Sequence, residues 1–220
     1  MPVIGHILPI ALAVAISSVP ITATIILLLS PSRSRSAAPF LIGWVLGIFA
    51  TVTLASLAAQ AIPVGRTRRQ ADTALGVLAI IVGVALIVLA IASWRRARLN
   101  PPQLPKWLGS LESIGPWQSL GVALLLNLRP KGLLLAIAAG LTIRGDAESM
   151  SDAVVAIVVY TVIGASTVAV PIIATLAAPA RMEPRLVRAR EWLDAHGEAV
   201  TNIILIFIGV VTVGAGIARL

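Results

Sequence analysis

The stretch Asn127-Leu128-Arg129-Pro130-Lys131 interrupts an otherwise apolar run, with GVALLL at 121–126 before it and GLLLAIAAGL at 132–141 after it. If residues 117–141 cross a bilayer, two cations and a proline lie near the middle of that span. A charge at that depth costs at least about 2.5–3.5 kcal/mol on insertion scales, so it usually faces a cavity or a partner and marks a pathway. Proline removes a helix hydrogen bond and frees a carbonyl group. The stretch therefore predicts a broken helix that lines a polar site, as in secondary transporters.

The composition of the whole chain is that of a membrane protein. It is 58% hydrophobic and only 12% charged, whereas a soluble domain of this length needs far more polar surface. Apolar runs of about twenty residues, long enough to cross a bilayer, recur along it. Strand-type alternation is absent, which excludes a barrel. We expect an all-α integral membrane protein with six transmembrane helices, at about 3–29, 39–62, 71–94, 117–141, 152–178 and 200–218.

The distribution of Lys and Arg predicts the orientation. Ten of these cations lie in the loops after the first, third and fifth helices, and four in the loops after the second and fourth. By the positive-inside rule the richer set faces the cytoplasm, which puts both termini outside a cytoplasmic membrane, although the arginines at 66–69 oppose this. The net charge of +8 is spread over short loops, so we expect it to contact anionic lipid headgroups and not nucleic acid.

The sequence argues against an enzyme and against a cofactor. There is no cysteine, and two distant histidines do not make a metal site. No phosphate-binding loop is present, so ATP hydrolysis is not intrinsic. Ser166 has no histidine base within reach of the membrane interior, which leaves a dyad with Lys131 as the remaining catalytic alternative. The acidic residues all fall in expected loops or at helix ends, which argues against strong proton coupling.

Two connecting segments have an amphipathic pattern. Residues 105–117 and 181–196 place apolar side chains at helical spacing among charged ones. Such helices lie in the headgroup plane with the apolar side towards the lipid. They are either connectors that fix the neighbouring spans or surfaces that gather lipid, and the sequence leaves both open.

The two halves of the chain show partial matches. Ser17-Ser18-Val19-Pro20-Ile21-Thr22 precedes an apolar run as the stretch at 127–131 does, and Gly43–Gly47 (GWVLG) has a counterpart in Tyr160–Gly164 (YTVIG). We expect one transmembrane domain, with inverted three-helix repeats at about 1–94 and 117–220 around a connector at 95–116. Pro20 and Pro130 are then breaks that meet near the midplane; the alternative is two ordinary proline kinks.

Several motifs resemble one family. They are Pro9 to Pro20 with the following LLLSP at 27–31, FLIGWVLG at 40–47, Lys106-Trp107 to Gly121, and PKGLLLAIAAG at 130–140. In this order and spacing the chain resembles the Sap/GAP family of actinobacterial membrane proteins (sulfolipid-1-addressing and glycopeptidolipid-addressing proteins), within the lysine-exporter superfamily. The family usually has Asn before the proline, where this chain has Arg129.

The resemblance implies a six-helix protein that moves a cell-envelope lipid or glycolipid outward, alongside a larger lipid exporter. Export of amino acids or other small molecules, and a non-transporting scaffold, are the alternatives; a homo-oligomer is open, because Gly43-x-x-x-Gly47 packs helices within a monomer or across a dimer. From the residues themselves we expect an anionic ligand, unless the cations only pair with carbonyl groups freed at the breaks. The candidate binding residues are Asn127, Arg129, Pro130, Lys131, Ser17, Ser18, Pro20 and Thr22, with Thr161 as a weaker candidate.

Overall fold

The computed structural model describes residues 2–61, 68–99 and 114–220. These residues form eight helices, which are α1 (Pro2–Ala15), α2 (Ser18–Leu29), α3 (Arg33–Gln60), α4 (Arg68–Leu99), α5 (Pro116–Asn127), α6 (Pro130–Asp146), α7 (Met150–Ala177) and α8 (Pro179–Ile217). Four of them, α3, α4, α7 and α8, are each long and apolar enough to cross a membrane. The pairs α1–α2 and α5–α6 pass the same test together, which gives up to six spans. An all-α, multi-pass architecture is confirmed.

The first and fourth spans are broken, as the sequence predicts. The bend between α1 and α2 is 48°, and that between α5 and α6 is 62°. Pro130 is the first residue of α6 and Pro20 the third of α2. Both prolines therefore sit in a first turn, where the backbone N–H groups have no partner within the helix and proline is tolerated. Each proline starts the second half of its span.

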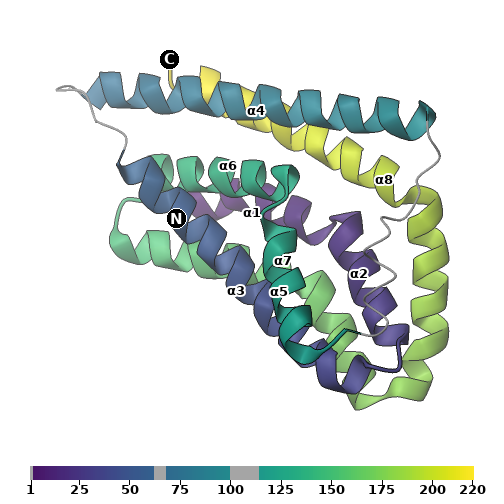
Figure 1. Cartoon of the computed structure of the whole chain (residues 1–220). Coiled ribbons are helices and arrows are strands. Elements are labelled where there is room, and N and C mark those ends of the chain that lie inside the picture. Colours follow the sequence, from purple (N-terminus) through teal and green to yellow (C-terminus); the bar gives the residue numbers. More distant parts are fainter. Residues whose placement is uncertain (1, 62–67, 100–113) are drawn as a thin grey trace.

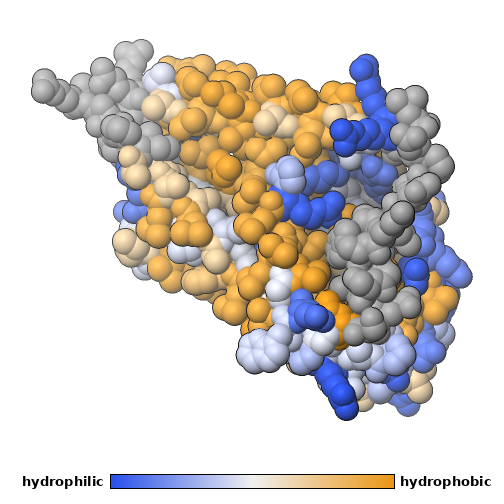
Figure 2. Space-filling model, in the orientation of Figure 1, coloured by the Kyte–Doolittle hydropathy of each residue, from blue (hydrophilic) through white to orange (hydrophobic). Residues whose placement is uncertain are grey.

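The chain crosses between two sides of the molecule. In Figure 1 the α2–α3 turn, the end of α4 and the α7–α8 junction lie towards the right, whereas the end of α3, the start of α4 and both chain ends lie towards the left. Figure 2 shows a largely hydrophobic face, with hydrophilic residues gathered along the right edge, where the first part of α8 runs. The loops rich in Lys and Arg that the structure describes thus share one side.

Glycines bring several pairs of helices into close contact. Helices α4 and α8 are antiparallel, and a Cβ on Gly83 would lie 2.7 Å from the carbonyl oxygen of Gly209. One on Gly76 would lie 2.7 Å from the corresponding oxygen of Gly216. Small residues of this kind let helix backbones approach closely.

The second close contact joins the two halves. A Cβ on Gly43 of α3 would fall on the carbonyl oxygen of Leu120 in α5, and one on Gly47 would fall on the side chain of Asn127. The sequence left open whether these two glycines pack helices within a monomer or across a dimer. In the structure they pack helices within one molecule. Helix α7 packs in the same way across α1, where Gly164 faces Val14.

The two amphipathic segments that the sequence predicts fare differently in the structure. Residues 181–196 are not a separate helix, because they form the first part of α8, which bends before it runs along α4 (Figure 1). Helix formation continues there because no proline separates the amphipathic part from the apolar part, and the single glycine between them, Gly197, is buried within the helix. The amphipathic segment at 105–117 falls largely outside the described residues. Of the arginines at 66–69, Arg68 and Arg69 begin α4, and Arg66 lies outside the described residues. The inverted repeat itself stays a prediction.

Candidate functional site

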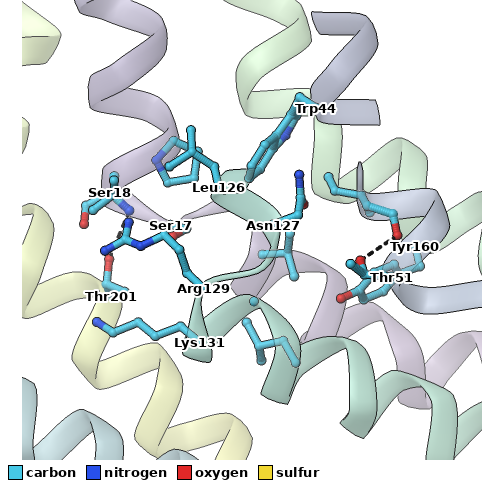
Figure 3. A pocket seen from close by; sticks show the side chains of 16 residues that line it. Ser17, Ser18, Trp44, Thr51, Leu126, Asn127, Arg129, Lys131, Tyr160 and Thr201 are labelled. Atoms are coloured by element: carbon cyan, nitrogen blue, oxygen red, sulfur yellow. Dashed lines mark hydrogen bonds between the residues drawn. The ribbon is translucent and has the colours of Figure 1, made fainter. Parts of the chain in front are cut away.

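A cavity lies where the two broken spans meet. Ser17, Ser18 and Pro20 line it from the first break, and Asn127, Arg129 and Lys131 from the second. Tyr160 of α7, Thr201 of α8, and Trp44 and Thr51 of α3 complete its polar lining. Figure 3 shows that Arg129 and Lys131 extend side by side, with the guanidinium group of Arg129 next to Ser18 and Thr201. The structure thus brings six of the predicted residues to one place.

Threonines hold the first break. The Thr201 hydroxyl accepts a hydrogen bond from the backbone N–H of Ser18 at 3.3 Å and donates to the Gly197 carbonyl oxygen at 2.8 Å. The Thr167 hydroxyl donates to the carbonyl oxygen of Ala15, the last residue of α1, at 2.5 Å. A buried backbone group left without a partner costs several kcal/mol in lipid. Side chains of α7 and α8 therefore supply what the interrupted helix lacks.

The second break depends on a close backbone approach. A Cβ on Gly132 would lie 2.8 Å from the carbonyl oxygen of Asn127, so only glycine lets the first turn of α6 fold back against the end of α5. The Asn127 side chain is buried, and its amide Nδ2 donates to the Ala123 carbonyl oxygen at 2.9 Å. Asn127 is thereby held against Gly47 of α3.

Lys131 is tied to side chains of α4 and α8. Its Nζ donates to the Ser93 hydroxyl at 3.3 Å and to Oδ1 of Asn202 at 3.4 Å. Ser93 in turn donates to Oε1 of Glu198 at 3.3 Å. The expected alternative was that Lys131 pairs with carbonyl groups freed at the breaks. Its hydrogen bonds go to side chains of other helices instead.

Glu198 corrects one expectation from the sequence. It lies within α8, and a single serine separates it from Lys131, whereas the sequence placed every acidic residue in a loop or at a helix end. The argument against proton coupling from missing acids therefore loses its basis at this site.

Arg129 carries an unpaired charge in the cavity. It is half-buried, and its guanidinium group forms no hydrogen bond or ion pair with any residue that the structure describes. It is also the residue before the first turn of α6. The amide groups and the dipole of a helix N-terminus add positive potential at that point.

Trp44 adds an unused donor. Its side chain is 3% exposed, it lines the cavity, and its indole Nε1 has no hydrogen-bond partner. Beside Lys131, the amide Nδ2 of Asn202 is likewise buried without a partner. Buried polar groups are nearly always hydrogen-bonded. The site therefore holds more donors than the protein itself satisfies.

The cavity is small in this conformation. The space that the centres of water molecules can occupy in it is about 50 Å³. One water needs roughly 10–15 Å³ of such space, so the cavity has room for a few water molecules. Sites that enclose a drug-sized ligand measure about 300–1,000 Å³. A single anionic group fits here, but a sugar or an acyl chain does not.

Three predicted residues lie elsewhere. Thr22 is buried in α2 and is not part of the cavity lining. The Thr161 hydroxyl donates to the carbonyl oxygen of Ile157 in its own helix at 2.8 Å, and Thr161 does not line the cavity either. Pro130 shapes the break, but its exposed ring is outside the lining. Whether any of the candidates contacts a ligand stays a prediction.

Sequence reasoning missed the contributions of the other helices. Thr201 and Asn202 stand at the start of the last apolar run, and an amide side chain in such a run was an available signal. The Ser166 hydroxyl donates to the Ile163 carbonyl oxygen at 2.7 Å, and the hydrogen bonds of Lys131 go to other residues. Nothing therefore pairs these two as a catalytic dyad.

The fold and the site define a class, which is an all-helical, multi-pass membrane protein with two broken spans around a cationic cavity. The model of the Sap (sulfolipid-1-addressing protein) family matches residues 7–218, so the chain belongs to this family. No curated protein and no solved structure matches it. The wider link to the lysine exporters stays a prediction.

Proposed function

We propose that the protein moves an anionic cell-envelope lipid, or helps a larger exporter to move it, by binding the charged headgroup in the cavity between the broken spans. The family, whose description refers to a sulfolipid, supports a role in lipid addressing. The observation that carries the proposal is the unpaired guanidinium group of Arg129, half-buried at the start of α6. An isolated buried charge is costly, and an anionic ligand would offset that cost.

The donor set favours sulfate or phosphate over an amino acid. Arg129, Lys131 and the indole of Trp44 all donate, and no acidic side chain is among the described residues that line the cavity. A planar guanidinium group suits a tetrahedral oxyanion, to which it donates two hydrogen bonds. The ammonium group of an amino acid would find no carboxylate in the lining.

The size of the cavity suggests how a lipid is handled. A headgroup oxyanion enters, while its sugar and acyl chains stay between the helices or in the bilayer. Passage of a whole headgroup needs a wider conformation, and the two breaks are where such a change would be absorbed. We further propose a cytoplasmic membrane location with both termini outside, following the loop charges.

The test uses two lipids that differ only in the sulfate group. Purified protein is incubated with a sulfated glycolipid or with its unsulfated parent, and bound lipid is counted by native mass spectrometry. We expect a preference for the sulfated lipid, which Arg129→Gln and Lys131→Met each reduce at least tenfold. Arg144→Gln is the matched control, because this arginine belongs to the last turn of α6, away from the cavity.

A second measurement separates a transporter from an accessory protein. Liposomes that contain the protein and a trace of fluorescent sulfated lipid are treated with a quencher that does not cross the membrane. Faster movement between leaflets than in empty liposomes indicates transport, and selective binding without movement indicates an accessory or scaffold role. Equal binding of both lipids by the wild type and the variants would refute the headgroup site.

A further inference from the structure

A second cavity lies on the side of the chain ends. Its volume is about 280 Å³ for water centres, several times that of the first cavity, and helices α1, α4, α6 and α8 line it. The lining is mostly apolar, with Pro9, Ile10 and Leu141 among its residues. Its ionisable members are His6, Asp146 and Arg219.

These three ionisable residues form one cluster that joins two helices and the residues that follow a third. Nη2 of Arg219 donates to Oδ1 of Asp146 at 2.5 Å, and Nδ1 of His6 lies 2.9 Å from the other carboxylate oxygen. The side chains of Asp146 and Arg219 are only 15% and 20% exposed, whereas that of His6 is 68% exposed. The cluster therefore ties α1, α6 and the residues after α8 together where the second cavity meets the outside.

Both cavities lie on the same face of α6. Lys131 and Leu135 line the first cavity, and Ala138, Thr142 and Asp146 line the second. Successive spacings of four and three residues put such positions on one side of a helix. A straight stripe along α6 thus leads from the cation at its start to the carboxylate at its end.

Only about one helical turn separates the cavities. On α1, Val14 lines the first and Ile10 the second; on α6 the corresponding residues are Leu135 and Ala138. A turn of helix rises about 5.4 Å. All four side chains are at most 8% exposed, so they form an apolar barrier between two hollow regions.

We propose that the two cavities are successive sites along one transport route between α1, α6 and α8. The His6–Asp146–Arg219 cluster is then the gate that closes this route at its far end. This rests on the proposed function, because the route would carry the anionic headgroup from the cationic cavity. Arg219 closes the gate by pairing with Asp146, and opening it separates the end of α6 from the end of α8. In the conformation described, the gate and the apolar barrier are both closed.

The chain has no native cysteine, so a single reporter tests the gate directly. Thr142 lines the second cavity and donates only to the Ala138 carbonyl oxygen of its own helix. The Thr142→Cys variant is reconstituted and labelled with a thiol reagent that does not cross the membrane. Adding Asp146→Asn or Arg219→Gln should raise the labelling rate at least tenfold, whereas Arg144→Gln should not change it.

The exchanged pair Asp146→Arg with Arg219→Asp restores the attraction and should return the rate to that of the closed protein. Labelling of a separate Met150→Cys variant, at an exposed position, shows that the reagent reaches the protein, and a cooperative thermal unfolding transition shows that each variant is folded. Unchanged rates in the two single variants would overturn the gate. If every variant of the cluster fails to fold, including the exchanged pair, the cluster is a structural clamp. That result would also overturn the gate.

The route has its own readout. The sulfated glycolipid, and not its parent, should accelerate labelling of the Thr142→Cys variant with an intact gate, and Lys131→Met should abolish this effect. Lipid that binds selectively without accelerating labelling overturns the route but leaves the headgroup site standing. Lipid that does not bind at all refutes the proposed function. The gate is tested separately, because the labelling rates of the gate variants are measured without any lipid.

Discussion

Replacing Gly43 with Ala tests the close contact between α3 and α5 that carries Trp44 and Asn127 to the cavity. The new Cβ would fall on the carbonyl oxygen of Leu120 and lie 3.1 Å from Cβ of Ala123. A backbone oxygen cannot rotate away, so the helices must separate. Overpacking of this kind costs about 1–3 kcal/mol.

The matched control is Gly121→Ala on α5, where a Cβ meets nothing within 4 Å. Both substitutions gain about 1 kcal/mol of helix propensity, which cancels in the comparison. The variants should therefore differ by about 1–3 kcal/mol in the free energy of unfolding, with Gly43→Ala the less stable.

The assay is thermal unfolding in one detergent, followed by tryptophan fluorescence. For a chain of this length 1 kcal/mol corresponds to roughly 2–4 °C in the midpoint, so the two midpoints should differ by about 2–12 °C. Equal midpoints would show that α3 and α5 are not held at the separation described, and the placement of Trp44 in the cavity would fall with them.

Three further outcomes are expected. Thr201→Val removes the acceptor of the Ser18 N–H at the first break and should cost about 1–3 kcal/mol in thermal unfolding; a change below about 0.5 kcal/mol would mean that another group takes over. Gly47→Ala should displace the side chain of Asn127, whose amide occupies that space, so lipid selectivity should fall more than stability does, and normal selectivity would contradict this. Glu183→Gln should change stability by no more than about 0.5 kcal/mol, because its arginine partner lies 3.9 Å away and both side chains are exposed; a larger loss in a melting experiment would reveal a stronger anchor for the first part of α8.

The sequence by itself determined the class of protein and the place of both breaks. Run length and composition decide which segments can enter a bilayer, and both are local properties. Pro130 lacks a backbone N–H group, and the charges beside it cannot face lipid, so the interruption at 128–129 follows from neighbouring residues alone. The first break follows the same local reasoning from Pro20, although it falls slightly earlier, at residues 16–17.

Only the tertiary structure decided which side chains meet at the cavity. Thr22 and Thr161 were expected there because they are polar. A polar residue in a helix can also face its own backbone or a buried neighbour. Periodicity does not say which helix lies opposite it. Thr201 reaches the first break, and Glu198 comes close to Lys131, because α8 packs against helices more than fifty residues away in the chain. Such contacts depend on the long-range packing of α4 and α8, which no local pattern contains.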